Sequence, residues 1–227
     1  ATKDKFFSII GHDLKGPLTN IQELTHMLLE DFDTFNKKEL KTIFEHLNVS
    51  TKNSVFLLEN LLDWYRTEKT KMLFNPKELQ LHKEIVEIVN LFEPIAKKKS
   101  IAIKYAYNSA MTVFADRNMF DSIIRNLLSN AIKYTNENGE ICIETVKYKG
   151  YTEISIEDNG IGMDQDTIEE LYQLNATKSK RGTAQEKGTG LGLLICKEFI
   201  EKHNGKLNIN SKAGKGSTFS FSLPDQK

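Results

Sequence analysis

Apolar residues in the first third of the chain recur at alternating three- and four-residue steps, which places them in a heptad stripe along a helix. One series covers residues 7–28, with Pro17 in its vacant slot, and a second covers 40–64. The members are Phe7, Ile10, Leu14, Ile21, Leu24 and Leu28, then Leu40, Ile43, Leu47, Ser50, Ser54, Leu57, Leu61 and Trp64. With segment 31–36 between them, the two series predict two long helices joined by a short turn, an antiparallel hairpin over residues 1–68.

The apolar face of the second predicted helix is wider than one partner helix could cover. Phe44, Leu58, Leu62 and Tyr65 flank its heptad stripe. Such a face is typical of four-helix bundles, in which two hairpins pair. We therefore expect a homodimer that forms through the hairpin. The alternative is a hairpin that packs on the rest of its own chain.

Beyond the hairpin the pattern changes from helical spacing to alternation. Residues 69–77, with Asn75-Pro76 near their end, are predicted to be a linker. Residues 78–227 predict an α/β domain with helices against one face of a sheet, so the whole chain is expected to be α+β. We expect strands at 78–81, 101–107, 111–116, 140–148, 151–158, 206–211 and 217–224, and helices at 82–99 (interrupted or kinked at Pro94), 119–134 and near 190–203.

The charges of the chain balance, with 31 Lys and Arg residues against 31 Asp and Glu residues. This balance argues against binding to nucleic acid or to a membrane surface through bulk charge. No run approaches the roughly 18–20 apolar residues of a membrane span. Cys142 and Cys196 lack the spacing of a disulfide framework or a metal site, which favours a reducing compartment. The chain starts at Ala1 rather than Met, so we expect it to be a fragment of a longer protein.

Three polar motifs stand out in residues 78–227. In the first, Asn126, Asn130 and Lys133 are three and four residues apart and therefore share one face of a helix. Amide oxygens beside an ammonium group suit a hydrated Mg²⁺ together with phosphate oxygens. The ordinary alternative is the solvated face of an amphipathic helix.

The second motif, Asp158-Asn-Gly160-Ile-Gly162, stands at the end of a predicted strand. A carboxylate followed by two glycines lets the backbone approach a flat ligand closely, although a plain turn would use the same residues. The third, Gly188-Thr189-Gly190-Leu191-Gly192, leads into a helix, where exposed N–H groups favour phosphate. A Rossmann motif would need a preceding strand, whereas here a polar segment precedes. Its Lys178, Lys180 and Arg181 could close over phosphates as a lid, or the segment could be a surface loop.

The order and spacing of the motifs point to one family. Asn130 precedes Asp158 by 28 positions, and Asp158 precedes Gly188 by 30. Together they resemble the Bergerat fold of GHKL ATP-binding domains, which include gyrase, MutL and histidine kinases. The resemblance implies an α/β sandwich that binds ATP and Mg²⁺, with Asp158 on the adenine amino group and Asn130 and Asn126 on the metal. The residues it assigns to the nucleotide are Asn126, Asn130, Lys133, Tyr134, Asp158, Gly160, Gly162, Lys178, Arg181, Gly188, Thr189, Gly190, Leu191, Gly192 and Thr218.

Residues 7–18, FSIIGHDLKGPL, resemble the H-box of two-component sensor histidine kinases. His12 falls at the f position of the heptad, opposite the packed stripe. Pro17 lacks the N–H that would bond the Asp13 carbonyl, so the helix should kink or loosen there. The resemblance implies that ATP phosphorylates His12, with Asp13 accepting a proton, and that the phosphoryl group passes to an aspartate of a response-regulator receiver domain. It also implies a cytoplasmic location within a larger bacterial sensor, open to membrane tethering, with no direct membrane contact by these residues.

Two positions depart from the family pattern. Gly16 stands where relatives with phosphatase activity usually carry Thr or Asn, so we expect weak dephosphorylation of the regulator. Residues 171–174, LYQL, replace a phenylalanine-rich box, and Tyr172 is expected to supply its aromatic ring.

Two other functions stay open. A GHKL ATPase that drives conformational change generally has a catalytic glutamate four residues before the metal-binding asparagine. Asn126 occupies that position here, and its amide cannot act as a base. A catalytically inactive dimeric scaffold is disfavoured, because His12, Asn130 and Asp158 are all present.

Overall fold

The chain divides into two compact units, residues 1–72 and 73–227, and the division falls within the predicted linker 69–77. Among the residues described, no helix is both long enough and apolar enough to cross a membrane. The structure is a computed structural model that describes residues 2–69, 74–106, 111–172, 182–184 and 191–225.

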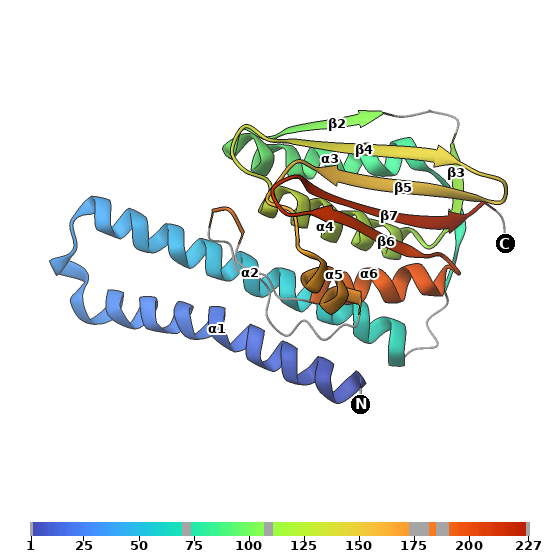
Figure 1. Cartoon of the computed structure of the whole chain (residues 1–227). Helices are drawn as coiled ribbons and strands as arrows, with labels where there is room; N and C mark the ends of the chain where they lie inside the picture. The colour runs from blue at the N-terminus through green and yellow to red at the C-terminus, as the bar shows by residue number, and fades with distance from the viewer. Residues whose placement is uncertain (1, 70–73, 107–110, 173–181, 185–190, 226–227) are drawn as a thin grey trace. The chain divides into compact units, whose positions relative to one another are not determined.

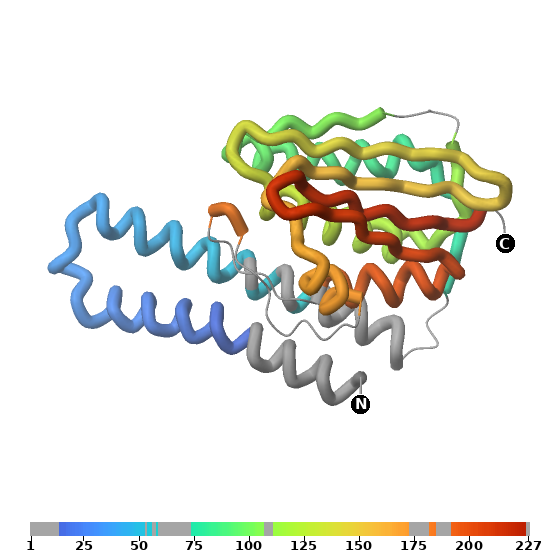
Figure 2. The backbone as a smooth tube through the Cα atoms, in the orientation of Figure 1, coloured from blue at the N-terminus to red at the C-terminus, as the bar shows by residue number. Residues whose placement is uncertain are grey.

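The first unit is the antiparallel helical hairpin that the heptad spacing predicts (Figures 1 and 2). The first helix is continuous through Pro17, so this proline does not interrupt it. The turn ends in a capping box. The Asn36 Oδ1 atom accepts hydrogen bonds from the N–H groups of Lys38 and Glu39 at 2.9 and 3.0 Å, and Glu39 accepts one from the Asn36 N–H. The elements are α1 (Thr2–Asp31), the 3-10 helix η1 (Phe32–Thr34) and α2 (Lys37–Lys69).

The heptad stripe forms the contact between α1 and α2. Ile43 and Ser50 are the most buried of its described side chains, with 7% and 6% of their surface exposed. Ser50 is a polar member of the stripe, and its hydroxyl accepts a hydrogen bond from the Asn20 Nδ2 atom at 2.6 Å. This bond joins the two helices and satisfies a polar group that the helix contact buries.

The second unit has two layers, with helices α3, α4 and α6 on one face of a five-stranded sheet (Figure 1). The strand order is β2-β4-β5-β7-β6, in which β2 and β4 are parallel and the other neighbours antiparallel. Strands β1 and β3 form a separate antiparallel pair. The elements are β1 (Lys77–Gln80), α3 (Leu81–Lys98), β2 (Ala102–Ala106), β3 (Thr112–Ala115), α4 (Arg117–Tyr134), β4 (Glu140–Lys147), β5 (Tyr151–Asp158), α5 (Gln165–Tyr172), α6 (Leu191–Lys202), β6 (Leu207–Lys212) and β7 (Gly216–Pro224).

The sequence pattern predicts most of these elements, and the structure differs at two places. Helix α3 is continuous through Pro94, so an interruption there is wrong. Ala96, 1% exposed, holds the last turn of α3 in the core after the proline. Helix α5 was not expected, because its eight residues hold only three apolar or aromatic side chains, Ile168, Leu171 and Tyr172, a series too short to predict a helix. Its start is nevertheless capped, since Asp164 accepts a hydrogen bond from the Thr167 N–H at 2.8 Å.

Alternate side chains of strand β5 are buried along its whole length, including its last residue, Asp158. Its inward side chains are Thr152, Ile154, Ile156 and Asp158, none more than 4% exposed, and they alternate with more exposed ones. Successive side chains of a strand point to opposite faces of the sheet. The register that buries the two isoleucines therefore also turns Asp158 toward the face covered by helices.

His203 joins the end of α6 to the start of α4. The side chain is 1% exposed, and its Nε2 atom accepts a hydrogen bond from the Asp116 N–H at 2.9 Å. Its Nδ1 atom lies 2.6 Å from the Phe199 carbonyl oxygen and donates to it. The Phe74 ring packs edge-on against the imidazole, with 4.8 Å between ring centroids. These contacts require a neutral imidazole, because a protonated Nε2 could not accept the Asp116 bond.

Acid should therefore destabilise the second unit through His203. Burial lowers the pKa of His203 below its ordinary value of 6.5. The unfolded chain then binds this proton more readily, so the free energy of unfolding should fall as the pH drops from 6.5 toward the lowered pKa. The measurement is urea unfolding at about pH 7.5 and about pH 5.5, followed by tyrosine fluorescence.

The variant His203→Gln removes the titrating group and should show a smaller difference between the two pH values. The matched control is His46→Gln, because His46 is exposed on α2. An unchanged pH dependence in His203→Gln would contradict this role.

Candidate functional site

Asp158 is a buried carboxyl group whose orientation is set by backbone donors. The Gly160 N–H donates to its Oδ1 atom at 2.9 Å, and the Ser217 backbone N–H donates to the same carboxyl group. Burial raises the pKa of Asp158, and these two hydrogen bonds oppose that rise. A carboxylate accepts about four hydrogen bonds, so it retains acceptor capacity for a donor on a ligand.

The loop after Asp158 crosses the end of α4. The Ile161 N–H donates a hydrogen bond to the Tyr134 carbonyl oxygen at 3.1 Å. A β-carbon at position 160 would overlap that same carbonyl group, so only glycine lets the loop pass so close to the helix. The Asp-Gly motif and the asparagine-bearing helix are thus in direct contact.

Asn126 and Asn130 lie one turn apart on α4 and differ in exposure. Asn126 is 4% exposed, and its Nδ2 atom donates to the Ser122 carbonyl oxygen at 2.9 Å. Its Oδ1 atom faces the first turn of α6, where a β-carbon on Gly192 would come within 2.6 Å of it. Asn130 is only partly buried. The glycine motif therefore contacts the asparagine helix through Asn126, and Asn130 offers the more accessible amide.

Lys133 and Tyr134 form a pair at the end of α4. The Lys133 Nζ atom donates to the Tyr134 hydroxyl at 2.9 Å and lies 4.6 Å from the centroid of its ring. Both side chains are partly buried. The pair presents an ammonium group beside the contact between α4 and the Asp-Gly loop, where an anion would find a positive partner.

The carbonyl groups in the last turn of a helix have no partners within the helix. At the end of α4, donors from three other segments bind them. Besides Ile161, these donors include the side chain of Lys99 and the backbone and hydroxyl of Thr183, two residues that lie outside the sequence motifs. The contacts are Lys99 Nζ to Ile132 O at 2.7 Å, Thr183 N to Lys133 O at 3.0 Å and Thr183 Oγ1 to Thr135 O at 2.8 Å.

The other predicted site residues fall in several places. Thr218 lies in β7 opposite Glu157, whereas Ser217 pairs with Asp158. Gly162 has a positive φ of 61°, and Leu191 and Gly192 open α6. His12 and Asp13 lie in α1, but their side chains are outside the described residues, so their roles stay predictions. Lys178, Lys180, Arg181, Gly188, Thr189 and Gly190 also lie outside the described residues.

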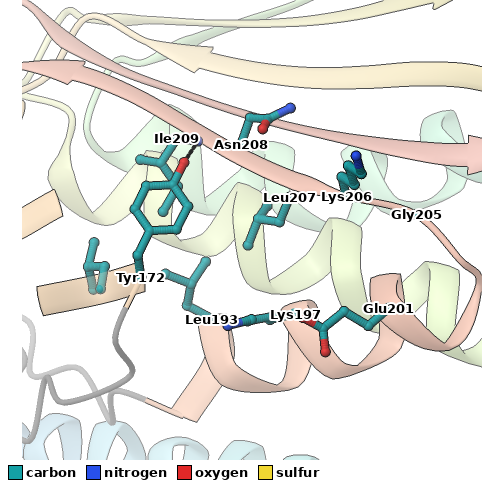
Figure 3. Close-up of a pocket in the computed structure, with 10 residues that line it drawn as sticks. Tyr172, Leu193, Lys197, Glu201, Gly205, Lys206, Leu207, Asn208 and Ile209 are labelled. Carbon is teal, nitrogen blue, oxygen red and sulfur yellow. Dashed lines mark hydrogen bonds between the residues drawn. The ribbon is translucent and has the colours of Figure 1, made fainter. Parts of the chain in front are cut away.

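Tyr172 ties α5 to the edge of the sheet. Its hydroxyl accepts a hydrogen bond from the Ile209 N–H at 2.8 Å, drawn as a dashed line in Figure 3. A pocket of about 220 Å³ lies beside this contact, between α5, α6 and β6, and Leu193 and Leu207 are among its walls. None of the residues predicted to bind nucleotide lines this pocket. It is therefore separate from the site around Asp158.

A magnesium ion would need ligands other than carboxylate clusters here. Among the described residues, no three His, Cys, Asp or Glu side chains gather where they could hold a metal ion. The Asn130 amide oxygen fits one ligand position of a metal whose other ligands are phosphate oxygens and water, and the neighbouring Lys133 fits the phosphate itself. The donor set thus fits a magnesium–nucleotide complex better than a bare ion.

Two family models match the chain. One, described as His Kinase A (phospho-acceptor) domain, matches residues 2–70. The other, described as histidine kinase-, DNA gyrase B-, and HSP90-like ATPase, matches residues 115–227. The sensor histidine kinases YvrG and WalK of Bacillus subtilis are 28% and 27% identical over 100% and 97% of this chain. The chain spans 39% and 36% of the length of these two relatives.

Solved structures show the same likeness. The catalytic domain of histidine kinase ThkA is 30% identical, with a TM-score of 0.58 over 67% of this chain and 97% of that chain. A structure of ThkA in complex with the response regulator protein TrrA is 23% identical, with a TM-score of 0.75. It covers 98% of this chain and 61% of that one, so both units have the fold of that kinase.

Proposed function

Because the chain belongs to the sensor histidine kinases, we propose that its second unit binds ATP and that the γ-phosphoryl group passes first to His12 and then to a response regulator. The observation that carries the proposal is the position of α4 between the other two motifs. It contacts the Asp-Gly loop through Tyr134 and the glycine motif through Asn126. The two other motifs therefore both contact one helix, which supports a single site for the three.

In this proposal Asp158 recognises the base. Its carboxylate is oriented by the Gly160 and Ser217 N–H groups and accepts a hydrogen bond from the exocyclic amino group of adenine. A guanine would present a carbonyl oxygen at the same position and repel the carboxylate. Burial of Asp158 strengthens this discrimination, because water cannot replace the missing donor.

The phosphates are assigned to the polar face of α4. Asn130, with Asn126 one turn earlier, offers amide oxygen for Mg²⁺, and Lys133 and Tyr134 contact ribose and phosphate. Mg²⁺ bound with the nucleotide would offset the charge of the phosphate oxygens. Lys178 and Arg181 are assigned to the phosphates on their charge and their position in the sequence.

The acceptor is proposed to be His12. One imidazole nitrogen attacks the γ-phosphorus, a P–N bond forms, and the bond to the leaving oxygen of ADP breaks. The proton on the other ring nitrogen passes toward the Asp13 carboxylate, which keeps the attacking nitrogen basic. The phosphohistidine then transfers its phosphoryl group to an aspartate of a receiver domain.

We also propose that the hairpin forms a homodimer, and exposed apolar side chains on α2 support it. Phe44, Val55 and Leu58 are 56%, 49% and 47% exposed. Val55 and Leu58 lie 11 and 14 residues after Phe44, close to three and four whole turns of a helix, so the three side chains share one side of α2. A patch of this kind on a helix marks a contact with another chain. The ThkA–TrrA complex supports a response regulator as the further partner, and the family supports a cytoplasmic location.

Incubation of the chain with γ-labelled ATP and Mg²⁺ tests the function. A protein-bound label that is labile in acid and stable in alkali supports a histidine kinase, because phosphoramidates have this stability. Free labelled phosphate without bound label would indicate an ATPase. If the reaction yields neither bound label nor free phosphate, the chain is a scaffold, and this result would contradict the proposal.

Gly16 should limit removal of the phosphoryl group from the regulator. It lies one helical turn after His12 and is exposed, and a β-carbon there would meet no atom within 4 Å. The variant Gly16→Thr should therefore fit without strain and place a hydroxyl where it can position water. We expect a several-fold faster dephosphorylation of the phosphorylated receiver, measured by loss of label.

Gly16→Ala is the matched control, because it adds the β-carbon without the hydroxyl. It should dephosphorylate the receiver at the wild-type rate. Equal rates for Gly16→Thr and the wild type would refute the role of this position.

A further inference from the structure

Thr183 is bound through its N–H and its hydroxyl by groups at the end of α4 and by Lys99. Its N–H donates to the Lys133 carbonyl oxygen at 3.0 Å, and its hydroxyl donates to the Thr135 carbonyl oxygen at 2.8 Å. The same hydroxyl accepts a hydrogen bond from the Lys99 Nζ atom at 2.6 Å. The residue belongs to the connection between α5 and α6, far from α4 in the sequence, so these contacts form only in the folded unit.

Lys99 is placed to hold the carboxyl end of α4. Besides Thr183, its ammonium group donates to the carbonyl oxygens of Ile132 at 2.7 Å and Lys133 at 3.3 Å. An ammonium group has three donors, and these three acceptors match them. The carboxyl end of a helix is also the negative end of its dipole, which favours a cation there. Lys99 is partly buried, whereas its neighbours Lys97 and Lys98 are exposed.

Lys99 and Thr183 form a cluster that contacts the turn of α4 carrying two residues assigned to the nucleotide, Lys133 and Tyr134. Both bind carbonyl groups of the turn that carries Lys133 and Tyr134. The orientation of a helix end depends on how its free carbonyl groups are satisfied.

We propose that Thr183 and Lys99 are positioning residues for the nucleotide: they anchor the last turn of α4, which carries Lys133 and Tyr134, and thereby set the affinity for ATP. Neither residue contacts the reacting atoms in this proposal. The inference rests on the proposed function in taking ATP as the ligand. It predicts an effect on binding and none on the later transfer from His12 to the receiver.

The variant Thr183→Val tests the anchor, because it keeps the N–H and the shape of the side chain and removes only the hydroxyl. Loss of two hydrogen bonds, one of them to a charged group, should weaken Mg²⁺–ATP binding roughly 10-fold. The Michaelis constant for ATP in autophosphorylation should rise by the same factor, with kcat unchanged. Thr183→Ser retains the hydroxyl and should bind ATP like the wild type.

Lys99→Met supplies a second, independent variant, and Lys98→Met is its matched control on an exposed lysine. Lys99→Met should weaken ATP binding to a similar degree, and Lys98→Met should not. The double variant Thr183→Val with Lys99→Met should lose less than the product of the two single losses, because the two side chains share one hydrogen bond. Transfer from chain already phosphorylated on His12 to a receiver should proceed at the wild-type rate in every variant.

The outcomes separate this inference from the proposed function. A wild-type chain that binds no ATP would refute the proposed function itself. A wild-type chain that binds ATP, with equal affinity in Thr183→Val, Thr183→Ser and Lys99→Met, would refute the anchor alone. A fall in kcat with an unchanged Michaelis constant would also refute it, because that result is expected of general damage to the fold.

Discussion

Replacement of His12 by glutamine is expected to abolish the acid-labile, alkali-stable label that the chain acquires from γ-labelled ATP and Mg²⁺. Glutamine is polar and compatible with a helix, but its amide nitrogen shares its lone pair with the carbonyl group and is not a nucleophile. The label should fall to the background of a reaction without protein. Affinity for ATP should stay within about twofold of the wild type, because the residues assigned to the nucleotide all lie in the second unit.

His26 provides the matched control for this experiment. It lies in the same helix, two heptads after His12, and also at an f position. Its Nδ1 atom is 3.1 Å from the Glu30 Oε2 atom, and 65% of its side chain is exposed. The variant His26→Gln should keep the full label. Label that persists in His12→Gln, or that disappears in His26→Gln, would contradict His12 as the acceptor.

Replacement of Asp158 by asparagine should weaken ATP binding by roughly 100-fold, the effect of losing one or two hydrogen bonds to a buried charged group. The carboxylate accepts hydrogen bonds from the Gly160 and Ser217 N–H groups and, in the proposal, from adenine. An asparagine has one oxygen and an NH₂ group, so either a backbone donor or the adenine amino group would face another donor. Equilibrium binding of Mg²⁺–ATP measures the loss.

Glu157→Gln is the control for Asp158→Asn, since it makes the same chemical change at the preceding position of β5. Glu157 is exposed, whereas Asp158 is 4% exposed. Glu157→Gln should bind ATP like the wild type. Circular dichroism should show that both variants keep the native secondary structure. Equal affinity of the folded Asp158→Asn variant and the wild type would overturn the assignment of Asp158 to adenine.

Local sequence patterns predicted the elements that are long or strictly periodic. The heptad stripe predicted α1, α2 and the contact between them, since a period of seven residues leaves one face for the partner helix. The alternation in residues 151–158 predicted β5 and brought Asp158 to its end. Helix α5 was missed because its only apolar or aromatic residues, Ile168, Leu171 and Tyr172, make a single helical step in eight residues. Of the interruption or kink predicted at Pro94, the interruption was wrong, because α3 runs from Leu81 to Lys98 with Pro94 inside it.

The residues of the candidate site also divide into those that local motifs indicated and those that only the fold brings to the site. The motifs that contain Asn130, Asp158 and Gly192 were recognisable because their residue types and spacing are unusual for a short stretch of chain. Lys99 was one of three consecutive lysines and Thr183 one polar residue among many, so neither carried a local signal. Their hydrogen bond joins positions that are 84 residues apart. Similarly, the motif that contains Asn126, Asn130 and Lys133 did not reveal that the Asn126 amide is buried against Gly192.

The sequence by itself determined the helical hairpin, the α/β unit and the family of this protein, because these follow from periodicity and from motifs that each lie within a few turns or one strand. Only the tertiary structure decided how the motifs meet. The free carbonyl groups at the end of α4 need donors, and the fold supplies them from Ile161, Lys99 and Thr183. Which distant residues provide those donors depends on how helices and sheet pack, and packing has no period that can be read along the chain.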